Sequence, residues 1–92
     1  MSYNLLILKD VWIEIENAYD WYEGQKEGLG DDLLEEIEAC YDRLIENPER
    51  YPHINDRYRR IRTNRFPYLV LYKIQGKTVI INRVRHIKQR PL

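Results

Sequence analysis

The sequence predicts an α+β domain with the element order β-α-α-β-β-β. Apolar residues recur every three or four positions between about residue 10 and residue 47, which is typical of amphipathic helices. After residue 57 they recur at a period near two, which indicates strands, and no linker or internal repeat interrupts the chain. We therefore expect one domain over residues 1–92, with a helical hairpin packed on one face of a small, largely antiparallel four-stranded sheet.

The first predicted strand and helix lie within residues 3–26. Tyr3 to Leu8 (YNLLIL) is a short apolar run, which we interpret as a central strand because it is apolar on both faces. The helix is expected from Asp10, as N-cap, to about Lys26. Its apolar stripe has spacings of four, three and four residues and consists of Val11, Ile15, Ala18 and Tyr22.

A second helix is predicted from about Asp31 to Asn47. Glycines at positions 24, 28 and 30 indicate the turn between the two helices. The residue before a proline avoids the helical region, so Pro48 should end the second helix. Its apolar stripe consists of Leu33, Ile37, Cys40 and Leu44.

Three strands complete the prediction, over Tyr58–Thr63, Tyr68–Ile74 and Thr78 to about His86. Phe66-Pro67 introduces the second of them. Gln75-Gly76-Lys77 is expected to form a tight connection, because glycine can adopt a left-handed backbone conformation there.

Composition excludes several classes of protein and site. No apolar run approaches the roughly 18 residues of a membrane span, and the start MSYNLLILKDVW lacks the features of a signal peptide. A single cysteine, Cys40, cannot form an internal disulfide, so we expect a cytoplasmic protein. The sequence has no Cys/His cluster and no glycine-rich phosphate loop, and we therefore expect neither a metal nor a cofactor.

Zero net charge conceals a strong division between the two halves of the chain. Residues 1–50 hold 14 acidic and four basic side chains, a balance of −10. Residues 51–92 hold one acid and 11 basic side chains, a balance of +10. The acidic helices can neutralise part of the basic half, and the remainder favours an anionic partner.

The basic strip RYRRIRTNRFPY begins the C-terminal half. Alternation along a strand places Tyr58, Arg60 and Arg62 on one face, and Ile61 on the face toward the helices. Arg59 would lie on the helix side and could pair with Glu35 or Glu38. If Ile80 and Val84 also face the helices, two further arginines join the open face, and the C-terminal tail extends it. The expected binding residues, for phosphates or an acidic peptide, are Tyr58, Arg60, Arg62, Arg83, Arg85, Lys88 and Arg90.

Three segments resemble toxins of the RelE/ParE superfamily: GLGDDLLEEIEACYDRLIENPERYP, RRIRTNRFPYLVLYKI, and VIINRVRH with QRP close behind. Together they cover most of the chain. The resemblance implies a toxin of a type II toxin–antitoxin system, whose partner is an antitoxin that wraps the toxin with an extended, often acidic segment.

The resemblance leaves two mechanisms open. ParE-like members bind DNA gyrase, and this alternative is favoured here. RelE-like members cut mRNA on the ribosome, and by position their catalytic set would correspond to Arg60, Arg62, Arg65 and His86. Leu69 stands where the ribonucleases carry an arginine, and their terminal tyrosine is missing. A third alternative is a decayed member without toxicity.

Overall fold

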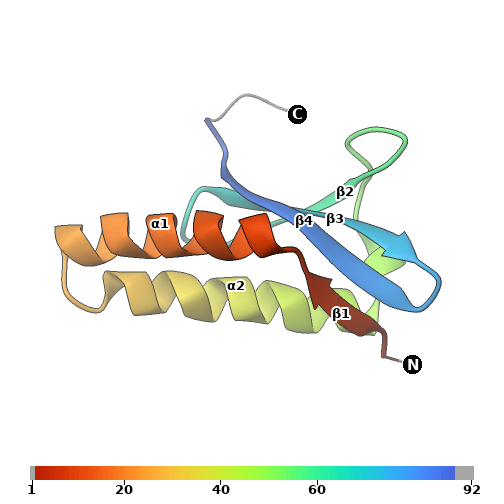
Figure 1. The fold of residues 1–92 in the computed structure, drawn as a ribbon, viewed down its shortest axis with the longest axis horizontal. Coiled ribbons are helices and arrows are strands. Elements are labelled where there is room, and N and C mark those ends of the chain that lie inside the picture. The colour runs from red at the N-terminus through yellow and green to blue at the C-terminus, as the bar shows by residue number, and fades with distance from the viewer. Residues whose placement is uncertain (1, 89–92) are drawn as a thin grey trace.

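The computed structural model describes residues 2–88, and its elements follow the predicted order (Figure 1). The α+β class and the β-α-α-β-β-β order are confirmed. The helices are α1 (Lys9–Gln25) and α2 (Leu29–Glu46), followed by a short 3-10 helix, η1 (Pro48–Arg50). The strands are β1 (Asn4–Ile7), β2 (Arg59–Arg62), β3 (Tyr68–Gln75) and β4 (Thr78–His86).

The four strands form one sheet in the order β1-β4-β3-β2. β1 runs parallel to β4, and the other two pairings are antiparallel, so the expected largely antiparallel sheet is confirmed. The prediction that β1 is central was wrong, because it lies at the edge with Leu5 36% and Leu6 50% exposed. β1 pairs only with the first half of β4, and α1 begins two residues after β1 ends.

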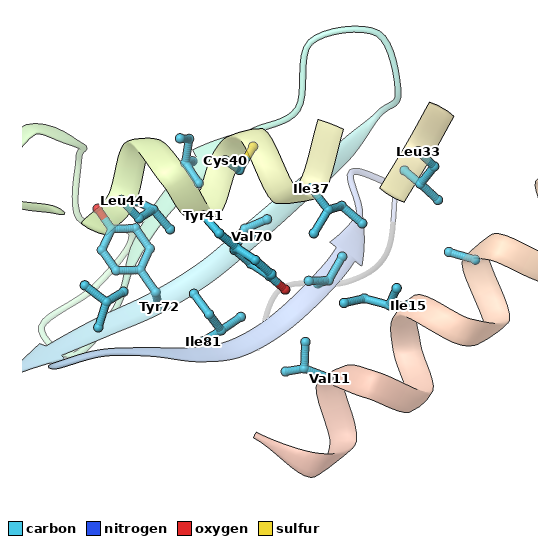
Figure 2. Close-up of a cluster of buried hydrophobic side chains, with 14 of the residues drawn as sticks. Val11, Ile15, Leu33, Ile37, Cys40, Tyr41, Leu44, Val70, Tyr72 and Ile81 are labelled. Carbon is cyan, nitrogen blue, oxygen red and sulfur yellow. The ribbon is translucent and has the colours of Figure 1, made fainter. Parts of the chain in front are cut away.

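The hydrophobic core lies between the helical hairpin and one face of the sheet (Figure 2). Both predicted helix stripes contribute to it. From the sheet come Ile61, Val70, Tyr72, Val79, Ile81 and Val84. The Tyr72 ring is fully buried, and its hydroxyl donates a hydrogen bond to the carbonyl of Pro48, which fixes η1 against β3.

The junction of β1 and α1 differs from the prediction. Leu8, not Asp10, is the N-cap residue of α1, and Asp10 lies in the first turn without a capping bond. The Leu8 N–H donates to the Ile81 carbonyl, while the Leu8 carbonyl accepts from Val11 N–H. Leu8 is therefore shared by the sheet and the helix, which lets α1 start directly at the end of β1. In the described residues, neither helix is long and apolar enough to cross a membrane.

A carboxylate closes the turn between the helices. Gly28 has φ +87° and is the N-cap of α2. Glu23 accepts hydrogen bonds from the backbone N–H groups of Gly28 (2.8 Å) and Gly30 (2.9 Å). A Cβ atom at Gly30 would lie 2.7 Å from the Tyr19 ring and 2.9 Å from the Glu23 carboxylate. Glycine is therefore required at position 30 by this close approach.

The Gly30→Ala variant is expected to lose about 1 kcal/mol of unfolding free energy, since displacing the Tyr19 ring and the Glu23 carboxylate costs about 1–3 kcal/mol and helix propensity offsets about 0.5–1 kcal/mol of it. Gly24→Ala is the matched control: it lies in α1, and a Cβ there meets nothing within 4 Å. That variant should gain about 0.5–1 kcal/mol from helix propensity. Urea unfolding monitored by circular dichroism measures both. Equal stabilities of the two variants would contradict the close contact at Gly30.

Candidate functional site

A β-bulge in β4 decides which side chains of that strand face away from the helices. Leu71 pairs with Arg83 while Tyr72 pairs with Ile81, so Asn82 is an extra residue on β4. Val79 and Ile81 before the bulge and Val84 after it all join the core. The condition stated for this strand is met by Val84 and not by Ile80, because Ile80 alternates with Val79 and Ile81 and points to the opposite face.

Four arginines share the sheet face that is turned away from the helices. Directly opposed residues of antiparallel strands project from the same face. One row across the sheet is Arg60–Leu71–Arg83 and the next is Arg62–Leu69–Arg85. Neighbouring strands are about 4.8 Å apart, so two lines of cations lie roughly 10 Å apart with leucines between them. We call these six residues the basic face.

Only one arginine of the basic face is neutralised within the described chain. Arg83 Nε lies 2.6 Å from Glu14 Oε2, and Glu14 Oε1 accepts the Val84 N–H at 2.9 Å. Arg60 and Arg62 are exposed and form no ion pair with a described carboxylate. The Nε of Arg85 is buried and has no hydrogen-bond partner among residues 2–88. The face thus carries a surplus of positive charge.

Arg59 and Tyr58 of the basic strip lie beside this face and are not among its six residues. Arg59 donates to the carbonyl oxygens of Glu49 (2.9 Å) and Tyr51 (2.8 Å). The expected pairing of Arg59 with Glu35 or Glu38 was therefore wrong, and its role is to hold η1 against β2. Tyr58 is half-buried and lies directly before β2, where its N–H donates to the Asn55 side chain at 2.9 Å.

The structure separates the residues that the ribonuclease alternative would bring together. The Arg65 N–H donates to Glu36 at 2.9 Å, and its guanidinium pairs with Asp32 at 3.1 Å, so Arg65 is attached to α2. His86 alternates with Arg85 and lies beside Tyr68, with ring centroids 5.3 Å apart. Its Nδ1 accepts the Lys88 N–H at 3.1 Å. Neither Arg65 nor His86 reaches the basic face.

The last two residues of the predicted binding set follow β4 in the sequence. Lys88 is exposed in the turn that follows the strand. Arg90 lies outside the residues that the structure describes. Within residues 2–88, all six residues of the basic face belong to strands.

Sequence reasoning missed two residues at the borders of this face. Glu14 occupies a half-buried position on α1, and its partner Arg83 is 69 residues away, so no local signal could identify it. Arg43 of α2 lines a surface hollow together with Arg60 and Arg62. Its position three residues after the core residue Cys40 was the only available indication.

Replacement of Glu14 by alanine is expected to lower the unfolding free energy by about 1–3 kcal/mol, because Val84 N–H and Arg83 both lose their partner. Glu14→Gln keeps an acceptor for Val84 and should lose less. The control is Glu16→Ala, an exposed acid on the same helix, with an expected change within about 0.5 kcal/mol. Urea denaturation compares the three variants, and equal midpoints for Glu14→Ala and Glu16→Ala would contradict the role of Glu14.

The comparisons with known proteins agree with this architecture. The profile of a family described as "ParE toxin of type II toxin-antitoxin system, parDE" matches residues 6–91. A chain of the solved structure described as "Chromosomal ParDE TA system from P. aeruginosa" superposes with a TM-score of 0.83 at 15% sequence identity, over 95% of this chain and 98% of that one. No curated protein is significantly similar in sequence. Since the profile spans nearly the whole chain, this protein belongs to the ParE toxin family of type II toxin–antitoxin systems.

Proposed function

We propose that this toxin is neutralised by an antitoxin that covers the basic face, and that the free toxin inhibits growth by binding DNA gyrase without cutting RNA. The observation that carries the proposal is the surplus of unpaired arginines on a sheet face that the protein's own helices leave uncovered. The target is proposed from family membership, because ParE-like toxins act on gyrase.

The basic face suits an acidic, extended segment of an antitoxin. Arg60 and Arg62 are two residues apart on one strand, a separation of about 7 Å, which equals the repeat of alternate side chains in an extended peptide. Acidic residues at alternate positions could therefore each reach one guanidinium group. The half-buried Leu69 between the cations offers apolar contact, and such complementarity gives both specificity and fast association.

The arrangement of titratable groups argues against the ribonuclease alternative. Cleavage of RNA needs a proton donor or acceptor within hydrogen-bond reach of the reacting oxygens, on the same surface as the cations that stabilise the transition state. His86 lies on the side of the sheet opposite Arg60 and Arg62, and Arg65 is bound to Asp32 and Glu36. Binding is therefore the better supported activity.

Expression of the toxin without its antitoxin, followed by two readouts, tests the proposal. Double-strand DNA breaks and filamentous growth with intact mRNA are the expected result. Rapid loss of translating mRNA with intact DNA would overturn the proposal in favour of the ribonuclease. Unaffected growth would overturn it in favour of a decayed, non-toxic member.

A further inference from the structure

A hollow of about 300 Å³ lies at the free edge of β2. It is lined by Arg43, Tyr51, Pro52, Arg60, Ile61 and Arg62. Three of these six residues are arginines, and they come from two elements, α2 and β2. No carboxylate belongs to the lining, so the hollow is strongly cationic.

The backbone of β2 directs this edge toward α2. Thr63 N–H donates to the Tyr68 carbonyl, so the backbone N–H and C=O groups of the odd-numbered residues of β2 bond to β3. The backbone groups of the even-numbered residues point away from β3. Arg60 N–H accordingly donates to the Pro52 carbonyl (3.1 Å), on the side away from β3. By the same alternation the N–H of Arg62 points outward, and it adds a backbone donor beside the guanidinium groups.

Cys40 holds the third arginine at this edge. Its Sγ lies 3.9 Å from the Arg62 carbonyl oxygen, and Arg43 Nη2 lies 3.4 Å from the same sulfur. Burial raises the pKa of the Cys40 thiol, an effect that Arg43 only partly opposes. The thiol is therefore uncharged at neutral pH and provides no counterion for the three arginines.

Three arginines and no carboxylate line this hollow, a charge balance that favours an anion there. Among the described residues, neither Arg43, Arg60 nor Arg62 forms an ion pair. A guanidinium group donates in a planar fork that matches the oxygens of a phosphate. Arginines on different sides of a hollow can reach the oxygens of one phosphate from several directions, whereas a carboxylate offers two oxygens on one edge.

We propose that this hollow binds the phosphodiester backbone of a nucleic-acid strand. Arg43, Arg60 and Arg62 contact the phosphate oxygens, and the half-buried Tyr51 ring offers a surface on which a base can stack. Binding involves no cleavage. The site gives the toxin a second kind of ligand, and it does not depend on gyrase being the target.

Arg43 separates this site from the antitoxin surface, because Arg60 and Arg62 belong to both whereas Arg43 belongs to the hollow alone. The test is fluorescence anisotropy of labelled 20-nucleotide single-stranded DNA, duplex DNA and single-stranded RNA of one sequence, without gyrase. Arg43→Ala is expected to weaken binding about three- to tenfold. On single strands it should also reduce the slope of the logarithm of the binding constant against the logarithm of the salt concentration by about 0.7, the contribution of one phosphate contact.

The matched control is Arg57→Ala, which removes a positive charge from the exposed loop before β2 and should leave binding unchanged. Arg43→Lys keeps the charge without the fork and should bind with intermediate affinity. The three nucleic acids show which phosphodiester source is preferred. Equal affinity and salt slope for Arg43→Ala and wild type would overturn the proposal. So would binding of polyglutamate that requires Arg43 while no oligonucleotide binds. Failure here would leave the growth and gyrase results unaffected.

Discussion

The Tyr72→Ala variant is expected to lose about 3–5 kcal/mol of unfolding free energy, a large part of the stability of a domain of this size. Tyr72 is fully buried, and it is among the largest side chains of the core (Figure 2). Removing the ring leaves a cavity between β3 and α2 and deletes the hydrogen bond to Pro48. Urea unfolding followed by circular dichroism measures the loss. A cost below about 1 kcal/mol would show that the core relaxes into the space.

The Tyr72→Phe variant isolates the hydroxyl group and should cost about 1 kcal/mol. Burial raises the pKa of Tyr72 to about 12, despite the opposing effect of nearby Arg59. The phenol is protonated in both states below pH 10. Between about pH 10 and 12 the Tyr72 phenol ionises only in the unfolded state, so its contribution to the unfolding free energy is lost as the pH rises through that window. The Phe variant should show a shallower loss of stability in this range. An unchanged slope would contradict the shifted pKa.

Local periodicity predicted most of the fold. The stripe from Val11 to Tyr22 faces the core because its spacing places all its members on one side of a helix. Pro48 ended α2 as expected, and Gly76 has the predicted left-handed backbone at φ +61°. Each of these features depends on interactions between residues close in sequence, and such interactions can be recognised without a structure.

Features that depend on distant partners were not predicted correctly. An apolar run such as β1 looks the same at the centre of a sheet and at its edge, since only the neighbouring strand and α1 distinguish the two. Both sets of alternating residues on β4 begin with apolar residues, so the sequence does not reveal the bulge at Asn82. With the bulge, Ile80 lies on the face away from the helices. Arg59 and Arg65 found partners in η1 and α2 that spacing could not identify.

The candidate site was predicted only in part, because some of its features depend on residues distant in the sequence. The placement of Arg60 and Arg62 around the buried Ile61 follows from strand alternation alone. Their alignment with Arg83 and Arg85 depends on the bulge, and the neutralisation of Arg83 depends on Glu14 of α1. Arg43 joins the same region only because α2 packs beside the edge of β2.

Simultaneous reversal of two charges, Arg60→Glu with Arg62→Glu, is expected to weaken binding of the antitoxin at least about 100-fold. Truncating one partner of a charge pair that is buried in an interface typically costs about 2–5 kcal/mol, and reversal adds repulsion between like charges. Both side chains are exposed and have no partner in the described chain, so the fold should remain intact. Isothermal titration calorimetry with the antitoxin encoded beside the toxin gene measures the change, and circular dichroism checks folding.

The control for this prediction is Arg57→Glu, which reverses a charge in the loop before β2 and lies outside the basic face. If antitoxin binding depends only on net charge, this variant loses as much binding free energy per reversed charge as the double variant. If binding depends on the two rows of arginines, Arg57→Glu keeps nearly wild-type affinity. The difference should persist at high salt, because screening weakens long-range attraction more than direct contacts. Retention of wild-type affinity by the double variant would place the antitoxin on another surface.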